Sequence, residues 1–475
     1  MKLKTLSLVN YRGFEQLEID FQDDVNVIAG VNGVGKSSIL DAIRILYSRG
    51  LPRFTPANIR PLAFVEEDIQ QSKISALVSC TFEHKLQAYQ IEAQRIDSGR
   101  LEELSLDLKI VRAKIEGSRE PDSAHLLPEL QREEKSLRKL FKSETERWSF
   151  LNALPSSTAK MNPTDEKLEN RRIKKQASSD QLNPVVMYFS VDRQLVRPAP
   201  SYQSQKPLSV SGAYLNALDA RPVRLPSFAS WFRAQEALGG PRRQTILQKI
   251  HHAAYEFLGM HFMIKSTEYK PGWVFFLDKE GTLLTVSQLS DGERNILALV
   301  FDIARRLSLA NPDLDDPIAD GKAIVLIDEL ELHLHPSWQR QVLRRLKNTF
   351  KNCQFIVTTH SPQVIGEVEA RSLILLGHHD GKVIKEKASQ TLGMDSNWIL
   401  LHLMGTEERD EETKEELRKI QQAVTEKDLG SARELINQLE LKRGIFAALQ
   451  ASKSLLDRFE LLERKNAKKD RKSVV

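Results

Sequence analysis

The fold is decided by one eight-residue stretch, Gly30-Val31-Asn32-Gly33-Val34-Gly35-Lys36-Ser37, which fits the phosphate-loop pattern G-x-x-x-x-G-K-[ST]. The apolar residues 25–29 precede it and the helix-like residues 38–43 follow it, so the loop joins a strand to a helix. Glycines at positions 30, 33 and 35 allow successive backbone N–H groups to face one anion. We therefore predict a loop that binds nucleotide phosphates within an α/β fold.

The polar side chains of this loop predict the ligand. Lys36 supplies a positive charge for the β and γ phosphates, and the hydroxyl of Ser37 is a suitable ligand for Mg²⁺. Asn32 and Ser38 complete the nucleotide-binding set that we predict from the loop. The cofactors implied are ATP and Mg²⁺.

Two further apolar runs each end in polar residues. Residues 323–327 lead into Asp328 and Glu329, as expected of a strand that is buried on both faces and whose end opens onto a site. We expect Asp328 to hold Mg²⁺ and Glu329 to polarise the attacking water. Residues 353–359 place His360 at the same sheet edge, where we predict that it senses the γ-phosphate.

A polar stretch, Leu289-Ser290-Asp291-Gly292-Glu293-Arg294, lies between the phosphate loop and the two carboxylates. By itself it is an ordinary helix start, with Ser290 or Asp291 as the N-cap. In this order of motifs it resembles the ABC signature in the form used by structural-maintenance, Rad50 and RecF proteins. The resemblance implies that Ser290 and Gly292 of one subunit cap the nucleotide in another, so that ATP joins two heads.

Two other stretches resemble parts of the same ATPases. Asn10-Tyr11-Arg12-Gly13-Phe14 is similar to the start of RecF-like and Rad50-like proteins, which implies that Arg12 lies near the phosphates; a plain surface arginine in a turn is the alternative. Glu331-Leu332-His333-Leu334-His335-Pro336 resembles a loop that RecF-like and OLD-family ATPases place at the dimer interface. We therefore do not expect its histidines to bind metal.

At 475 residues the chain is long enough for two or three domains. We expect an α/β, ABC-type ATPase head assembled from two lobes, with an inserted short helical hairpin and a C-terminal helical segment. The hairpin is predicted from Leu101, Leu104, Leu108, Val111 and Ile115, which form an a/d seam, and from a looser stripe through Trp148. That seam serves either assembly or internal packing. The predicted parts are an N-lobe at 1–84, the hairpin at 85–154, a polar linker at 155–183, a C-lobe at 184–389 and a helical region with a basic tail at 390–475.

Composition points to a cytoplasmic protein. The start of the chain does not resemble a signal peptide, and no apolar stretch reaches the ~18 residues of a membrane span, so we expect no membrane contact. Cys80 and Cys353 lie in strand-like runs and are expected to be reduced core residues. The 69 basic and 64 acidic residues leave a net charge of +5, which is small for this length and is weak evidence about partners, because these charges mostly indicate a solvated surface.

The C-terminal acidic residues do not fit a nuclease site. Glu407, Glu408, Asp410, Glu411 and Glu412 lie in a helical charge run, whereas the Toprim nuclease of OLD-family proteins needs carboxylates on strands. We expect a solvated helix face and no intrinsic nuclease.

Together with residues 393–400, Gly-Met-Asp-Ser-Asn-Trp-Ile-Leu, these features resemble PtuA-like ATPases of Septu-type and retron-associated anti-phage systems. The resemblance implies slow ATP hydrolysis, a homo-oligomer built from head-to-head dimers, and regulation of a separately encoded HNH nuclease. Nucleic acid, as phage DNA or retron msDNA, is a further candidate partner. The alternatives are a RecF- or Rad50-like repair ATPase that acts directly on DNA, and a PARIS-type defence ATPase with a Toprim nuclease partner.

Overall fold

The computed structural model forms two compact units, Met1–Ile399 and Leu400–Val475, and each is described by itself. The structure describes residues 1–57, 59–71, 73, 75–85, 87–96, 111, 131–132, 146–152, 182–191, 209–220, 225–267, 270–406 and 410–470.

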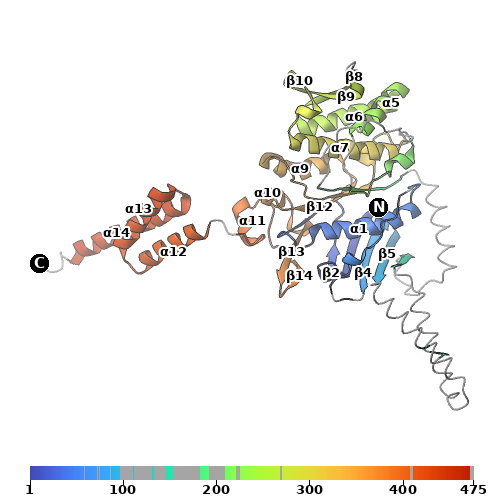
Figure 1. Ribbon diagram of the computed structural model, residues 1–475. Helices are drawn as coiled ribbons and strands as arrows, with labels where there is room; N and C mark the ends of the chain where they lie inside the picture. The colour runs from blue at the N-terminus through green and yellow to red at the C-terminus, as the bar shows by residue number, and fades with distance from the viewer. Residues whose placement is uncertain are drawn as a thin grey trace, which may run out of the picture. The chain divides into compact units, whose positions relative to one another are not determined.

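A six-stranded sheet forms the centre of the first unit (Figure 1). Its strand order is β14-β13-β3-β12-β11-β7, and all neighbours are parallel except β13 and β14. The strands are β3 (Val25–Gly30), β7 (Val185–Phe189), β11 (Ala323–Ile327), β12 (Cys353–Thr359), β13 (Leu373–His379) and β14 (Lys382–Glu386). Every residue of β3, β7, β11 and β12 is buried, which explains why these strands are mainly apolar. The predicted α/β fold and the predicted strands at 25–29, 323–327 and 353–359 are confirmed.

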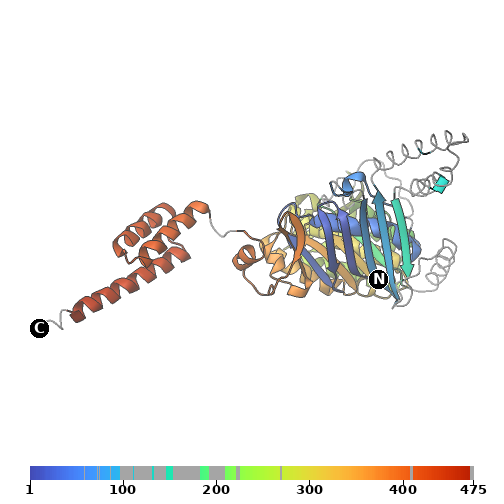
Figure 2. The same ribbon diagram turned by 90° about the horizontal axis from the view of Figure 1, so that it is seen from below.

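A second sheet is antiparallel and has the order β2-β1-β4-β5-β6 (Figure 2). Its strands are β1 (Lys2–Tyr11), β2 (Phe14–Asp20), β4 (Ser75–His84), β5 (Gln87–Ile96) and β6 (Glu146–Asn152). Helix α1 (Lys36–Gly50) packs between this sheet and the central one, with Ile39, Leu40, Ile43 and Leu46 buried. The helix that follows the phosphate loop is therefore held on both sides by apolar contacts.

Two of these strands correct the predicted hairpin boundaries. The range 85–154 contains β5 and β6, and Trp148, which we had placed on a helical stripe, lies in β6 opposite Ala93. In β5 the buried residues Tyr89, Ile91 and Ala93 recur every second position, the period of a half-buried strand. Residues 97–145, apart from 111, 131 and 132, and linker residues 155–181 lie outside the described residues, so the coiled coil stays a prediction.

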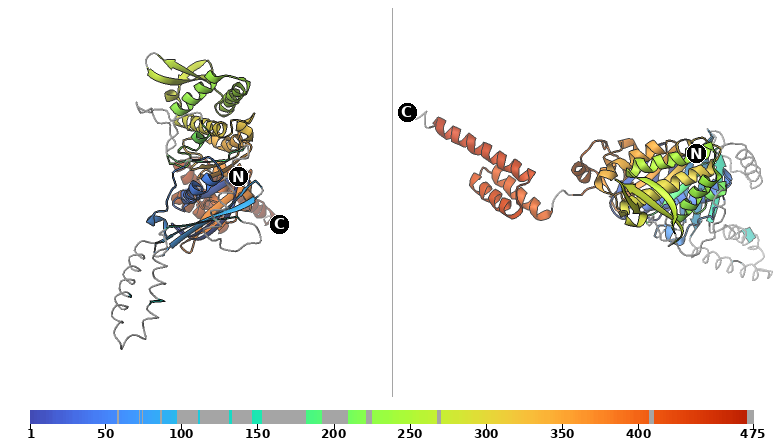
Figure 3. Two further views of the ribbon diagram at one scale, coloured as in Figure 1. Left: turned by 90° about the vertical axis from the view of Figure 1, so that its right-hand side faces the viewer. Right: turned by 90° about the horizontal axis from the view of Figure 1, so that it is seen from above.

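Three helices and a small sheet form a third part of the first unit (Figure 3). They are α5 (Leu225–Leu238), α6 (Pro241–Leu258), α7 (Asp291–Ala310), β8 (His261–Thr267), β9 (Lys270–Lys279) and β10 (Thr282–Thr285). Aromatic rings join them: Phe228 of α5 stacks on Phe301 of α7 with centroids 4.1 Å apart, and Phe262 of β8 meets Phe301 at 4.7 Å. This packing fixes α7, whose N-terminus carries the signature-like stretch.

The remaining elements of the first unit are one longer helix and several short helical turns. They are η1 (Leu51–Arg53), η2 (Glu66–Asp68), η4 (Val210–Ala213), η5 (Val286–Gln288), α8 (Pro317–Asp320), α9 (Pro336–Thr349), α10 (Pro362–Ile365) and η6 (Ala370–Ser372). Cys80 and Cys353 are free and buried, as expected. Among the residues described, no helix combines the length and the apolar character needed to cross a membrane.

The second unit contains α12 (Glu411–Thr425), α13 (Leu429–Arg443) and α14 (Ala447–Asp470). Their shared core includes Leu417, Ile420, Ile436, Leu439 and Leu456. The unit boundary at Leu400 differs from the predicted boundary at residue 390. Helix α11 (Ser396–His402) begins before it. The intervening residues pack on the first unit, because the N–H of Gly393 donates to the carbonyl of Gly366 at 2.9 Å and Ile399 is fully buried.

One buried amide connects the two large sheets. Gln354 of β12 accepts from the N–H of Leu3 at 2.8 Å and donates to the carbonyls of Leu3 at 2.9 Å and Gln22 at 2.7 Å. Gln354→Leu would remove the partner that this amide gives to the buried N–H and carbonyl of Leu3, so we expect a loss of about 2–4 kcal/mol in the free energy of unfolding. Urea denaturation measures it, with the exposed Gln244→Leu as control. A loss equal to that of the control would contradict this role.

Candidate nucleotide-binding site

The phosphate loop runs from the end of β3 to the start of α1, and its glycines are required by close contacts. A Cβ at Gly30 would lie 2.4 Å from the carbonyl oxygen of Leu376, and one at Gly35 would lie 2.6 Å from Cζ of Phe14. At Gly33, which has φ +79°, nothing lies within 4 Å of that position. The loop is therefore closed by protein on one side and open on the other, where Asn32 and Ser37 are exposed.

Lys36 is buried beneath the loop. Its Nζ donates to the carbonyls of Gly30 at 3.1 Å and Val31 at 3.0 Å. Burial lowers the pKa of Lys36 from its ordinary value, while the nearby carboxylates of Glu329, Glu331 and Asp328 act in the opposite direction. A phosphate would give this charge an anionic partner in place of neutral carbonyl groups.

Ser37 and Asp328 meet although they lie far apart in the sequence. Ser37 Oγ donates to Asp328 Oδ1 at 2.9 Å, and Thr358 Oγ1 donates to the same oxygen at 2.6 Å. A hydroxyl beside a carboxylate, next to a phosphate-binding loop, is the oxygen donor set that Mg²⁺ takes in phosphate-binding sites. The residues therefore fit Mg²⁺, and Ser37 and Asp328 would hold it.

The residues after Asp328 are held by the neighbouring strand β12. Glu329 has φ +46°, which is uncommon for a residue other than glycine, and its N–H donates to Thr358 Oγ1 at 2.8 Å. Glu331 accepts from Thr359 Oγ1 at 2.8 Å and from the N–H of His360. The sequence analysis did not predict site roles for Thr358 and Glu331. Their closeness in the sequence to His360 and Asp328 is the feature that could have indicated such roles.

His360 follows β12 and lies in the electric field of the same groups. Burial and the charge of Lys36 lower the pKa of the His360 imidazole, and three nearby carboxylates partly oppose this. Both of the lowering effects favour the neutral form of the imidazole. The structure brings Lys36, Asp328, Glu329 and His360 to one edge of the sheet, as the sequence predicted.

Arg12 lies beside the first turn of α1 and is already paired. It forms ion pairs with Asp68 at 2.8 Å and Asp41 at 2.9 Å, and its Nη1 lies 3.2 Å from Ser38 Oγ. These contacts tie the turn that carries Arg12 to the first turns of α1 and to η2. A contact between Arg12 and a phosphate stays a prediction, and it would need Arg12 to exchange one of these partners.

The signature-like stretch begins α7. Ser290 is the N-cap: its Oγ accepts from the N–H of Glu293 at 3.3 Å, and Glu293 Oε2 accepts from the N–H of Ser290 at 2.9 Å. Gly292 packs against the loop after Glu331, since a Cβ there would lie 2.5 Å from the carbonyl oxygen of His333. The N-cap interpretation is thus confirmed. Ser290 and Asp291 are exposed at this helix N-terminus, and a contact with another subunit's nucleotide stays a prediction.

The acidic run of the second unit has structural partners. Asp410 caps α12 by accepting from the N–H of Thr413 at 3.0 Å, and Glu412 pairs with Lys442 at 2.6 Å and Arg443 at 2.7 Å. Glu407 and Glu408 lie outside the described residues. Within the described residues no group of three or more His, Cys, Asp or Glu side chains is arranged to hold a metal ion.

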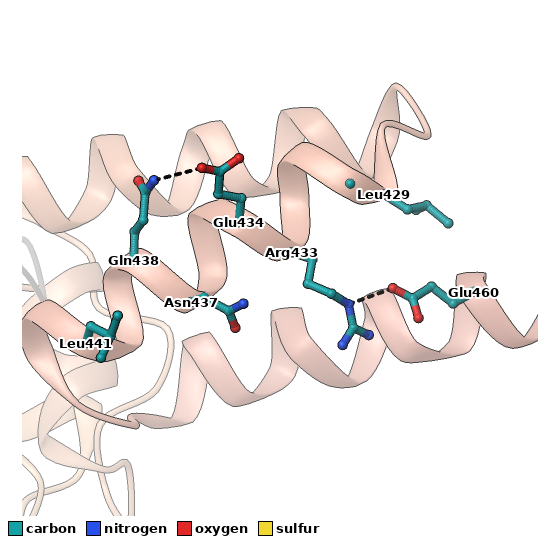
Figure 4. Close-up of a pocket in the computed structure, with 8 residues that line it drawn as sticks. Leu429, Arg433, Glu434, Asn437, Gln438, Leu441 and Glu460 are labelled. Carbon is teal, nitrogen blue, oxygen red and sulfur yellow. Dashed lines mark hydrogen bonds and ion pairs between the residues drawn. The ribbon is translucent and has the colours of Figure 1, made fainter.

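A groove of about 740 Å³ lies on the second unit, along α13 and beside α14 (Figure 4). Its cation, Arg433, pairs with Asp457 and Glu460, each at 2.8 Å. The other lining residues are Leu429, Gly430, Glu434, Asn437, Gln438 and Leu441. Because Arg433 already has two carboxylate partners, this groove lacks the free positive charge that a nucleotide requires.

Comparisons with known proteins agree with this geometry. Residues 25–366 match the model of a family described as "AAA domain, putative AbiEii toxin, Type IV TA system". The chain is 29% identical over 442 residues to the Retron Ec83 probable ATPase of Escherichia coli, which covers 87% of this chain and 78% of that protein.

Shorter segments of the chain are similar to two other proteins of retron and Septu systems. The Retron Vc95 probable ATPase of Vibrio cholerae serotype O1 biovar El Tor is 47% identical over 102 residues, 22% of this chain and 20% of that protein. The Septu protein PtuA of Bacillus mycoides is 36% identical over 117 residues, 24% and 16% of the two chains. These relatives confirm the resemblance to PtuA-like ATPases. Among solved structures, an SmcHead bound to the C-winged helix domain of ScpA has a TM-score of 0.44 at 16% identity, over 82% of this chain and 98% of that one.

Removing the buried lysine tests the site directly. We expect Lys36→Ala to weaken ATP binding at least about 10- to 100-fold, because a charge-assisted contact to phosphate is lost. Stability should change little, since Lys36 bonds only backbone carbonyls within the described residues. Titration with a fluorescent ATP analogue measures this, with Lys4→Ala on β1 as the control. Equal affinities of the two variants would contradict the assignment.

The lowered pKa of His360 predicts a pH dependence of stability. In the unfolded chain His360 takes up a proton as the pH falls below about 6.5, whereas in the folded chain it does so only at lower pH. Protonation therefore favours the unfolded chain, and the free energy of unfolding decreases as the pH falls below about 6.5. His360→Gln should therefore lose less stability than the parent between pH 7.5 and pH 5.5. Urea unfolding at both values measures it, with the exposed His252→Gln as control. A larger loss in His360→Gln would give the opposite sign.

Proposed function

The chain belongs to the AAA-domain family whose model covers residues 25–366, and from that premise we propose that it is the ATPase subunit of a cytoplasmic anti-phage defence complex. In this complex the chain binds and slowly hydrolyses ATP, assembles through head-to-head dimers, and regulates a separately encoded HNH nuclease. Phage DNA or retron msDNA is a further partner in this proposal.

The observation that carries the ATPase part is the meeting of Ser37 and Asp328 beside Lys36. The Ser37–Asp328 hydrogen bond of 2.9 Å joins the first turn of α1 to the end of β11. Glu329 and His360 lie at the same sheet edge. The carboxylate of Glu329 raises the pKa of Lys36, and the charge of Lys36 lowers the pKa of His360. The site therefore contains a cation that can bind phosphate, two oxygen donors for Mg²⁺, a carboxylate that can act as a base, and an imidazole.

Each residue has a distinct role in the proposed reaction. Lys36 and the loop N–H groups would bind the β and γ phosphates, and Ser37 and Asp328 would hold Mg²⁺, whose charge would offset that of the phosphates. Glu329 orients the attacking water and accepts its proton. His360, as a neutral imidazole, can donate a hydrogen bond to the γ-phosphate.

The open side of the loop supports a second subunit as the remaining part of the site. Asn32, Gly33 and Ser37 are exposed, so the nucleotide would face solvent in a single chain. We assign this side to Ser290 of the partner subunit, at a helix N-terminus that suits an anion. Binding of ATP would then favour the paired heads, and hydrolysis would favour their release.

The relatives support the defence context. The Retron Ec83 probable ATPase aligns with 87% of this chain, so the likeness extends beyond the nucleotide-binding motifs. The Septu protein PtuA aligns with 24%. The nuclease partner and the oligomer belong to the proposal and rest on this relationship.

Removing the base separates binding from hydrolysis. We expect Glu329→Gln to bind ATP with unchanged affinity and to hydrolyse it about 10²- to 10⁴-fold more slowly, because the proton acceptor is lost while the charge of Lys36 remains. Single-turnover hydrolysis and ATP-analogue binding measure the two quantities, with the exposed Glu18→Gln as control. Unchanged turnover in Glu329→Gln would remove Glu329 from the mechanism.

Assembly tests the defence proposal. The chain is co-expressed with the product of the neighbouring gene and examined by mass photometry with and without Mg²⁺–ATP. We expect a complex larger than a dimer that retains the neighbouring protein. The RecF-like alternative predicts a different result. The chain would dimerise only with ATP, would not bind the neighbouring gene product, and would hydrolyse ATP faster with DNA, with a steep dependence on salt concentration.

A further inference from the structure

Thr358 lies between the two acidic residues of the site and contacts both. Its Oγ1 donates to Asp328 Oδ1 at 2.6 Å and accepts from the N–H of Glu329 at 2.8 Å. The hydroxyl is the donor in the first bond and the acceptor in the second, so its proton points toward Asp328. Thr358 is fully buried, and its branched side chain restricts rotation about χ1.

The backbone of Thr358 adds a third contact to the same segment. Its carbonyl accepts from the N–H of Leu330 at 3.0 Å, so one residue of β12 holds three consecutive residues after β11. The middle one, Glu329, has φ +46°, a conformation that persists only where the surroundings hold it. The bond from its N–H to Thr358 Oγ1 is one such restraint.

We propose that Thr358 is a positioning residue for ATP hydrolysis: its hydroxyl orients the Asp328 carboxylate, which would hold Mg²⁺, and, through the backbone, sets the direction of the Glu329 carboxylate. The proposal rests on the ATPase function proposed above. The neighbouring Ser37 donates to the same Asp328 oxygen at 2.9 Å, so two hydroxyls from different elements hold this carboxylate through Oδ1.

Substitutions at position 358 separate the hydroxyl from the volume of the side chain. Thr358→Val keeps the shape and removes both hydroxyl bonds, whereas Thr358→Ser keeps the hydroxyl and removes the methyl group. Thr5→Val is a matched control, because Thr5 is also a strand threonine with a hydroxyl bond, to Thr81 at 2.6 Å, on the other sheet. Thr358→Ala replaces the valine variant if the latter does not fold.

The first readout is binding of a fluorescent ATP analogue as a function of Mg²⁺ concentration. We expect Thr358→Val to raise the half-saturating Mg²⁺ concentration about 10- to 100-fold, as loss of groups that orient metal ligands does, and to leave Mg²⁺-free binding unchanged. Thr358→Ser and Thr5→Val should stay near the parent. An equal loss in the serine and valine variants would show that only packing matters and would overturn the proposal.

The second readout uses the nucleotide-free protein. Hydrogen exchange of the Glu329 amide should be faster in Thr358→Val than in the parent and in Thr358→Ser, because the bond that protects it is gone. Unchanged exchange in Thr358→Val would overturn the positioning role. If the parent itself binds no Mg²⁺–nucleotide, the ATPase function fails, while this exchange measurement still decides whether Thr358 restrains Glu329.

Discussion

The hydrogen bond between Ser37 and Asp328 is the contact on which the site depends, because it joins two parts of the chain that the fold alone brings together. Strands β3, β12 and β11 are adjacent and parallel, so their carboxyl ends reach one edge of the sheet. Each strand is completely buried, and the polar residues that follow β3, β11 and β12 line this edge of the sheet. The chemistry of the site is therefore a consequence of strand order.

Burial then determines the charge state of the groups at that edge. Lys36 and His360 both have lowered pKa values because they leave water, and the carboxylates nearby limit this effect. Thr358 and Glu331 are hydrogen-bonded to the same segments, so the acidic residues are held before any ligand arrives. Such preorganisation suits a site that must meet the concentrated charge of a triphosphate.

The sequence predicted three strands of the central sheet, β3, β11 and β12, because strands buried on both faces appear as mainly apolar runs. It predicted β5 and β6 poorly, since Trp148 and the leucines before it also satisfied a helical spacing and the two-residue period of Tyr89, Ile91 and Ala93 was overlooked. Thr358 was missed because a threonine inside a strand is expected from β-propensity alone. Ser290 fitted two interpretations, and a single chain displays only the local one, the N-cap.

The central claim is that two chains complete each nucleotide site, and mixing two inactive variants tests it most directly. Lys36→Ala removes the phosphate charge from its own loop, and Ser290→Arg blocks the helix N-terminus offered to the other chain. ATP hydrolysis is measured for each variant alone and for their mixture. The account predicts little activity for each alone and recovery on mixing, because Lys36 of one chain then meets Ser290 of the partner subunit. A mixture no more active than its components, or full activity of Ser290→Arg alone, would contradict it.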